Sequence, residues 1–164
     1  MEGKSDYYIL NWFKAGYRNA AKMEIVPVNG IANAGALLSL YLGWVKDFVF
    51  HCDSDAEGEN AKVRYIERLP VRPEHFIDYS DVFGEAAKAP RMIEDLISKE
   101  TKSGIADYYS VKRCSKSHIL RYFSSALMGG ESSAVDQTTV DNLARLFDAI
   151  EKRMIEETAT SLTD

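Results

Sequence analysis

The sequence predicts an α/β fold in which a parallel sheet is flanked by helices and followed by a helical C-terminal extension. Between residues 6 and 79, helical apolar spacing alternates with short strand-like runs, and the connections are short. Such alternation is typical of parallel strands joined by crossover helices. The run at 45–52 is the most strand-like, and beyond residue 80 the strand signal fades. We therefore expect a core at residues 1–80 and a mainly helical extension, packed on that core, at residues 81–164.

Each element of the expected core has a local signal. Ser5 can cap a first helix at 6–15, which carries Ile9, Trp12 and Phe13 on one side. A strand is expected at 23–28, where Pro27 and the Asn-Gly turn that follows would end it. The remaining segments follow from apolar spacing and glycine breaks, which gives strands at 23–28, 45–52 and 74–79 and further helices at 33–42 and 58–69.

The C-terminal extension is predicted to contain three helices. They are expected at 91–99, 115–127 and 138–157, with an irregular polar segment at 100–114. Thr138 and Asp141 have the spacing of a capping box. The last helix carries an apolar stripe with heptad-like spacing, which favours packing on the chain's own core and leaves a homodimer as the alternative. The stripe consists of Val140, Leu143, Phe147, Ile150 and Met154.

Composition excludes several classes of protein. No apolar stretch reaches the roughly 18–20 residues of a membrane span, and no signal peptide is recognisable. Two cysteines, Cys52 and Cys114, give no disulfide framework, which favours a reducing cytoplasmic setting. The net charge of −5 argues against a protein that coats nucleic acid by bulk positive charge.

Charge is unevenly distributed along the chain. Residues 53–59 hold four acids and no base, whereas residues 109–121 hold four bases and no acid. An acidic metal-binding edge beside a basic strip would suit a phosphodiester substrate. A solvated helix face explains the basic strip equally well, so charge alone leaves both interpretations open.

Two short acidic clusters carry the most information. Glu2-Gly3-Lys4-Ser5-Asp6 opens the chain, and Asp53-Ser54-Asp55 follows directly on the predicted strand at 45–52. In parallel sheets, ligands collect at the carboxyl ends of strands. Crowded carboxylates repel one another unless a cation lies between them, and Mg²⁺ or Mn²⁺ suits oxygen ligands. The alternative is that these acids are solvated and cap the helix that begins near Gly58.

The Glu2-Gly3-x-x-Asp6 and Asp53-x-Asp55 elements, in this order, resemble the Toprim domain of topoisomerases, primases and certain nucleases. Within that superfamily the chain looks most like the nuclease region of the OLD (overcoming lysogenization defect) ATP-dependent endonucleases. Three further segments carry this finer resemblance, namely Val26-Pro27-Val28-Asn29-Gly30, Ile93-Glu94-Asp95-Leu96 and Ser115-Lys116-Ser117-His118-Ile119.

The resemblance implies a DNA endonuclease that requires Mg²⁺ or Mn²⁺. It implies metal ligands at Glu2, Asp6, Asp53, Asp55 and Glu94, with Asp95 as an additional candidate beside Glu94. It implies catalytic roles for Glu2, Asp53 and Asp55, and for Lys116 as a cation that neutralises phosphate charge. It also implies a sheet of about four strands, with the first strand truncated ahead of Glu2, and an upstream ATPase domain in the same polypeptide.

Two other functions stay open at this point. One is a primase- or topoisomerase-type Toprim enzyme, although no tyrosine lies in a recognisable second domain. The other is a noncatalytic module that keeps the Toprim fold for binding or regulation. The sequence contains no P-loop, so nucleotide binding through that motif is excluded.

Overall fold

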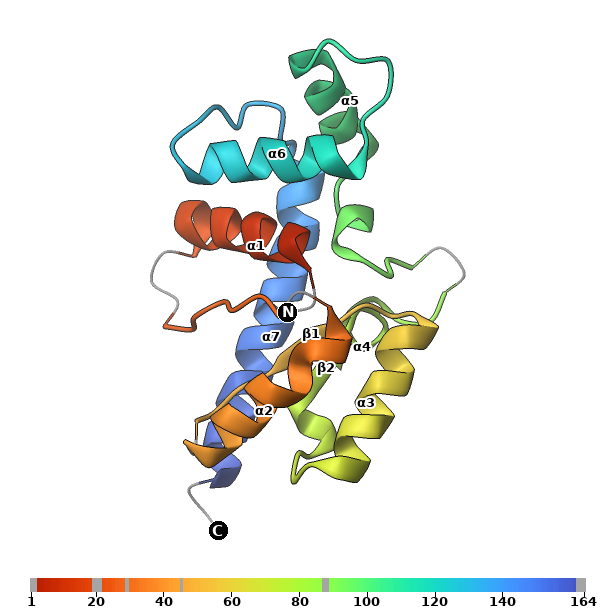
Figure 1. The fold of residues 1–164 in the computed structure, drawn as a ribbon. Helices are drawn as coiled ribbons and strands as arrows, with labels where there is room; N and C mark the ends of the chain where they lie inside the picture. The colour runs from red at the N-terminus through yellow and green to blue at the C-terminus, as the bar shows by residue number, and fades with distance from the viewer. Residues whose placement is uncertain (1–2, 19–21, 29, 45, 87–88, 162–164) are drawn as a thin grey trace.

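The structure is a computed structural model that describes residues 3–18, 22–28, 30–44, 46–86 and 89–161. It is an α/β fold dominated by helices (Figure 1). The α-helices are α1 (Lys4–Tyr17), α2 (Ala34–Gly43), α3 (Ala56–Arg68), α4 (Tyr79–Phe83), α5 (Lys99–Tyr108), α6 (Lys116–Leu127) and α7 (Gln137–Ser161). The strands are β1 (Phe50–Cys52) and β2 (Phe76–Asp78), and short 3₁₀ helices are η1 (Ile31–Asn33), η2 (Pro73–His75) and η3 (Ile93–Asp95).

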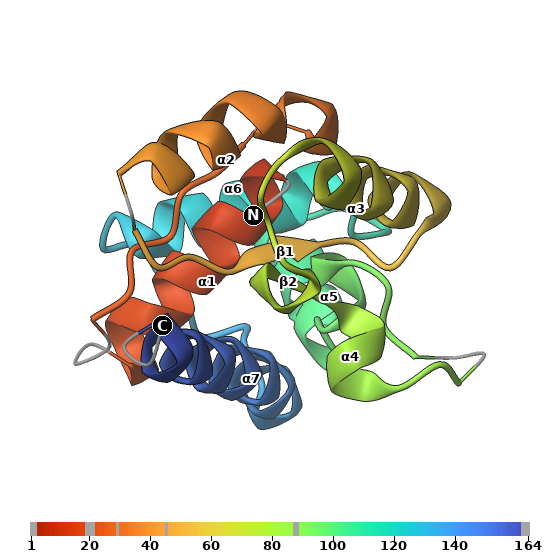
Figure 2. The same ribbon diagram turned by 90° about the horizontal axis from the view of Figure 1, so that it is seen from below.

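The described sheet has two parallel strands. Phe50 pairs with Phe76 and Cys52 with Asp78, and α3 makes the crossover between the strands. Figure 2 shows α2 and α3 on one face of this sheet and α7 with α4 on the other. The expected parallel, helix-covered sheet is therefore confirmed, but the four-stranded sheet is not seen in the described residues.

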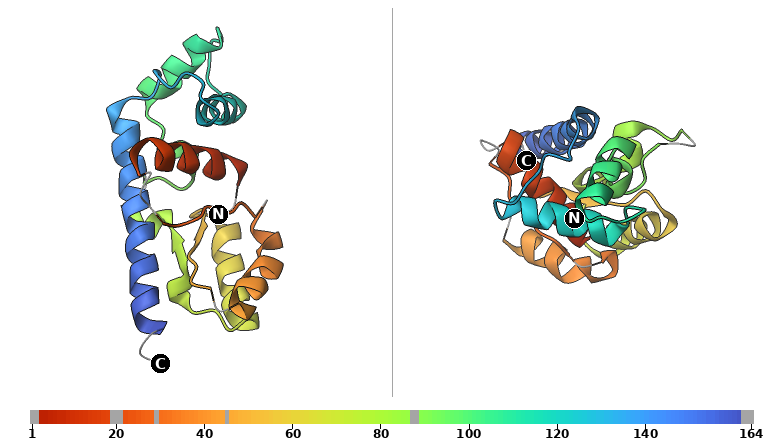
Figure 3. Two further views of the ribbon diagram at one scale, coloured as in Figure 1. Left: turned by 90° about the vertical axis from the view of Figure 1, so that its left-hand side faces the viewer. Right: turned by 90° about the horizontal axis from the view of Figure 1, so that it is seen from above.

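Two apolar clusters form the core. The first joins α1 to residues 77–150 and includes Phe13, Phe123 and Phe147. The second joins residues 28–76 around β1 and β2. Helix α7 runs along one side of the molecule (Figure 3, left) and contacts both α1 and α4. Its apolar stripe is buried from Val140 to Ile150, which confirms that it packs within the chain.

Several expected elements differ from the structure. The strand expected at 23–28 was wrong, since this segment is extended but belongs to no sheet. Pro27 lacks an N–H donor, and a cavity rather than a neighbouring strand separates the segment from β1. The strand expected at 45–52 is shorter in the structure, where β1 spans Phe50–Cys52. Its partner β2 has only three residues, because η2 directly precedes it and α4 directly follows it.

The helix prediction was wrong in the region before α6. The helix expected at 91–99 shortens to the single turn η3, and the segment expected to be irregular contains α5. Ser98 accepts a hydrogen bond from the Thr101 N–H and so starts a new helix at Lys99. The buried face of α5 consists only of Thr101, Ile105 and Ala106, so the sequence showed no clear helical spacing of apolar residues there. No helix in the described residues is long and apolar enough to cross a membrane.

A polar network fixes the start of α7 against α5. The Asp136 carboxylate accepts hydrogen bonds from the Thr139 N–H (2.9 Å), the Thr101 hydroxyl (2.9 Å) and the Ser98 hydroxyl (2.9 Å). Asp136 thus caps α7, in place of the expected Thr138–Asp141 box. Partial burial raises the pKa of Asp136, but these hydrogen bonds outweigh it and hold the pKa at about 2.

Replacing Asp136 with alanine should lower the free energy of unfolding by about 1–2 kcal/mol, because α7 loses its cap and two hydroxyls lose an acceptor. The folded-state pKa lies below the ordinary value of 3.8, so the stabilisation is complete above that pH and is lost as the pH falls toward 2. Urea unfolding at pH 7 and at pH 3 measures both effects. The exposed Asp141→Ala is the control, and an equal loss in both variants would contradict the prediction.

Candidate functional site

A small acidic pocket lies where five segments of the chain meet. Its volume is about 290 Å³, and its lining comes from the start of α1, Gly30 before η1, the segment after β1, η3 and the start of α6. Figure 1 shows α1 lying next to α6, with the strands below them. We call this cavity the acidic pocket. Its charged lining residues are Lys4, Asp6, Asp53, Glu94 and Lys116.

Asp6 is the most enclosed acid of the pocket, with 5% of its surface exposed. The Gly3 N–H donates to its Oδ2 at 3.0 Å, and a Cβ on Gly3 would lie only 2.8 Å from that oxygen. A side chain at position 3 would therefore displace the carboxylate. Burial raises the pKa of Asp6 to about 6, and the nearby Glu94 carboxylate acts in the same direction.

Tyr79 lies beneath this group of acids. Its hydroxyl donates to Asp6 Oδ1 at 3.3 Å, and its ring is fully buried. Burial raises the pKa of Tyr79 well above 10, and the charges of Asp6, Asp53 and Glu94 raise it further. The phenol therefore stays protonated and donates to Asp6. These three carboxylates come from different segments, and each lies near enough to the Tyr79 hydroxyl to raise its pKa. This is a second indication, besides the shared pocket lining, that the three acids lie near one another.

Glu94 and Lys116 face each other across the pocket. Lys116 Nζ lies 3.6 Å from Glu94 Oε2 and contacts the Met92 sulfur at 3.1 Å. The Lys116 side chain is 67% exposed, whereas that of Glu94 is 11% exposed. Lys116 is the first residue of α6, and Ser115 caps this helix by accepting a hydrogen bond from the His118 N–H. The lysine can therefore move while its Cα stays fixed.

The turn after β1 holds Asp53 in place. The Ser54 N–H donates to the Arg91 carbonyl at 2.9 Å, which ties this turn to the segment that leads into η3. Asp55 caps α3, because its Oδ1 accepts from the Gly58 N–H at 2.8 Å. The Asp53 carbonyl oxygen lies so close that a Cβ on Gly58 would be 2.2 Å away. The turn thus depends on glycine at position 58.

The structure brings together some of the acids expected at the site and not others. Asp6, Asp53 and Glu94 line the pocket with Lys116, while Asp55 is exposed at its helix cap and does not line it. Asp95 accepts from the Arg91 N–H at 3.0 Å and is also exposed. Glu2 lies outside the described residues. Within the described part of the chain, no three His, Cys, Asp or Glu side chains are grouped closely enough to hold one metal ion.

Sequence reasoning missed Tyr79 and a second acid at the sheet end. Asp78 ends β2 and accepts from the hydroxyl of Ser54 (3.1 Å) and the N–H of Ser80 (2.8 Å). Burial raises the pKa of Asp78, but hydrogen bonds from Ser80, Asp81 and Ser54 bring it below its ordinary value. The signal available beforehand was the position of Asp78 and Tyr79 at the end of a predicted strand.

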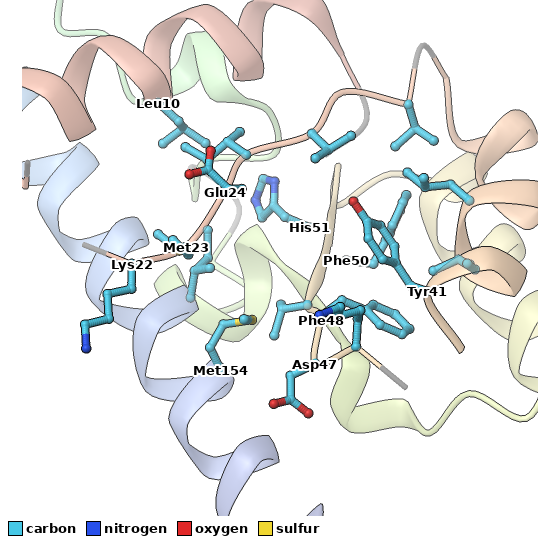
Figure 4. A pocket seen from close by; sticks show the side chains of 18 of the residues that line it. Leu10, Lys22, Met23, Glu24, Tyr41, Asp47, Phe48, Phe50, His51 and Met154 are labelled. Carbon is cyan, nitrogen blue, oxygen red and sulfur yellow. The ribbon is translucent and has the colours of Figure 1, made fainter. Parts of the chain in front are cut away.

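A larger cavity of about 550 Å³ lies beside β1 and is mainly apolar (Figure 4). It separates β1 from the extended segment 22–28, and His51 is its buried polar group. Neither ring nitrogen of His51 has a hydrogen-bond partner among the described residues. Burial lowers the pKa of His51 to about 3, so the ring is neutral. This cavity can contact a molecule mainly through apolar side chains, whereas the acidic pocket presents carboxylates and ammonium groups.

Comparison with family models, with curated proteins and with solved structures finds no match to this chain.

Replacing Gly58 with alanine should lower the free energy of unfolding by about 1–3 kcal/mol, because the new Cβ forces the Asp53 carbonyl or the first turn of α3 to shift. Gly16 in α1 is the matched control, since a Cβ there meets nothing within 4 Å. Gly16→Ala should leave stability unchanged or raise it by up to about 1 kcal/mol. Urea unfolding compares the two variants, and equal stabilities would show that the turn accommodates a side chain.

Proposed function

We propose that this chain carries the metal-dependent nuclease site of an OLD-type Toprim protein and that DNA is its substrate. The observation that supports this most strongly is the acidic pocket itself. Asp6, Asp53, Glu94 and Lys116 come from four separate segments and line one cavity. All four are among the residues for which the Toprim and OLD resemblance implies a role, whereas Asp55 does not line the cavity and Glu2 lies outside the described residues. A Toprim-like sheet of about four strands, of which β1 and β2 would be part, belongs to the same proposal.

The donor set fits a hard divalent cation. The acids of the pocket are carboxylates, and no imidazole or thiol is among its described lining residues. Carboxylate oxygens suit Mg²⁺ or Mn²⁺. The raised pKa of Asp6, to which Glu94 contributes, reflects a negative charge that is poorly solvated and that a cation would stabilise.

We propose that Asp6, Asp53 and Glu94 are metal ligands and that Glu2 and Asp55 complete the ligand set. In the described arrangement no three of these acids are grouped closely enough to hold one ion, so their side chains would have to move together when the cation binds. Asp55 would first have to break the hydrogen bond that its Oδ1 accepts from the Gly58 N–H at 2.8 Å. When bound, Mg²⁺ or Mn²⁺ would supply a water of low pKa and stabilise charge on the phosphate.

The chain's own residues would position the phosphodiester and the ligands. Lys116 is exposed enough to leave Glu94 and neutralise a phosphate oxygen in the transition state. Tyr79 stays protonated and donates to Asp6, so it would fix the direction of that carboxylate as a positioning residue. Such fixed orientation matters because small displacements of a catalytic group cost large factors in rate.

Replacing Asp53 with asparagine should weaken Mn²⁺ binding by on the order of tenfold or more, because one anionic oxygen ligand is lost from the pocket. Titration of Mn²⁺ into the purified chain measures this directly, and nicking of supercoiled plasmid with Mn²⁺ measures activity. Asp141→Asn removes the same charge from an exposed part of α7 and should bind as wild type. Equal affinity of Asp53→Asn and wild type would contradict the proposed metal site.

Replacing Lys116 with alanine should reduce nicking by on the order of a hundredfold, because a cation that stabilises the transition state is removed. The melting temperature should change little, since the side chain is 67% exposed. Lys152→Ala is the matched control, because that lysine is 78% exposed and lies on α7. Full activity in the Lys116 variant, or an equal loss in the control, would exclude the proposed role.

A further inference from the structure

A groove rich in basic side chains adjoins the acidic pocket. Its volume is about 690 Å³, and α5, the segment 111–115 and the start of α6 form its walls. We call it the basic groove and define it by its five cations, Lys99, Lys102, Lys112, Arg113 and Lys116. From this arrangement we propose that the basic groove binds the sugar-phosphate backbone of the DNA strand that leads into the acidic pocket. This inference rests on the proposed function, since it names the path by which the substrate reaches that site.

The charge of the groove is largely uncompensated. Its lining contains five cations and two acids, Glu94 and Asp107. Of the cations, Lys116 forms an ion pair with Glu94, while in the described residues no ion pair involves Lys99, Lys102, Lys112 or Arg113. In a protein of net charge −5, cations gathered without partners create a local positive field. A polyanion would relieve their mutual repulsion and release counterions.

The groove and the acidic pocket are adjacent. Glu94 and Lys116 line both cavities, so a strand bound along the groove would end beside the ion pair that borders the acidic pocket. Lys99 and Lys102 are three residues apart on α5 and therefore lie on the same side of that helix. Lys112 and Arg113 face them from the segment before α6. Figure 3 (left) shows α5 and α6 next to each other at one end of the molecule.

The size of the groove favours a chain of phosphates over a single small anion. It is more than twice the volume of the acidic pocket, about 690 Å³ compared with about 290 Å³, and its cations come from three separate segments. One phosphate can reach only some of these cations at once. A nucleic-acid backbone presents a series of phosphates, which can contact cations on several segments at the same time.

Binding of a short labelled DNA strand in the presence of EDTA tests the groove separately from catalysis. The triple variant Lys102→Ala, Lys112→Ala, Arg113→Ala should weaken binding at least about tenfold at about 0.1 M salt. It should also reduce the slope of log affinity against log salt by about 2, since each phosphate contact contributes about 0.7. The control Lys46→Ala, Arg68→Ala, Lys152→Ala removes the same charge from exposed positions outside the groove. Thermal unfolding verifies that both variants are folded.

Cys114 provides a readout within the groove itself. It lines the groove and is partly exposed, whereas Cys52 is 1% exposed. Alkylation of the native protein should therefore report on Cys114. The DNA strand should slow this reaction at least about fivefold at saturation, because a saturating ligand at a shared site blocks access to the thiol. Inorganic phosphate at the same total phosphate concentration should slow it far less.

The outcomes separate the groove from the nuclease site. Undiminished binding by the groove variant, an unchanged alkylation rate with DNA, or equal protection by inorganic phosphate would each overturn the proposal. The Asp53→Asn variant should still bind DNA in EDTA. If the wild-type chain binds DNA through the groove but shows no metal-dependent nicking, the proposed function is refuted and the groove is kept. If nicking does not depend on Lys102, Lys112 and Arg113, the groove is refuted and the proposed function is kept.

Discussion

The packing of α1 against α6 and α7 is the contact on which the acidic pocket depends. Trp12 of α1 meets Phe123 of α6 edge-on at 5.0 Å, and Phe13 meets Phe147 of α7 at 5.5 Å. These four rings are buried, and such pairs contribute about 0.5–1.5 kcal/mol beyond the area they bury. Because α1 and α6 are rigid, their contact fixes the distance between their first turns. Those turns carry Asp6 and Lys116.

The electrostatics of the site follow from this placement. The rise in the pKa of Asp6 from 3.8 to about 6 corresponds to on the order of 3 kcal/mol against ionisation. Hydrogen bonds from Gly3 and Tyr79 do not offset the loss of solvation. The acids are therefore gathered in an unfavourable arrangement, while neighbouring cations stay exposed. Under the proposed function, a divalent cation would stabilise the acids and a phosphodiester would stabilise the cations.

The resemblance selected residues that the fold does bring near one another, but it could not give their separate tasks. Asp53 and Asp55 look equivalent in an Asp-x-Asp pattern, yet one lines the pocket and the other caps α3. The difference is geometric, because the first turn of α3 directs the Asp55 carboxylate back to the Gly58 N–H. Tyr79 carried no motif, and its importance comes from contact with Asp6, which is 73 residues away. Glu2 lies outside the described residues, so its role stays a prediction.

The sequence by itself determined the parallel pairing of the strands around Asp53 and Asp78 and the helices with apolar spacing, namely those near 6–15, 33–42, 58–69, 115–127 and 138–157. Two of the expected caps were wrong, because α1 begins at Lys4, before Ser5, and Asp136 caps α7 in place of the Thr138–Asp141 box. These features depend on local periodicity and on end signals that adjacent residues supply. Tertiary structure decided the rest. The strand expected at 23–28 formed no sheet, and α5 was stabilised through the Ser98–Asp136 network. The basic groove arose from cations on α5, on the segment 111–115 and on α6. Each depends on contacts between residues distant in sequence, which local patterns do not record.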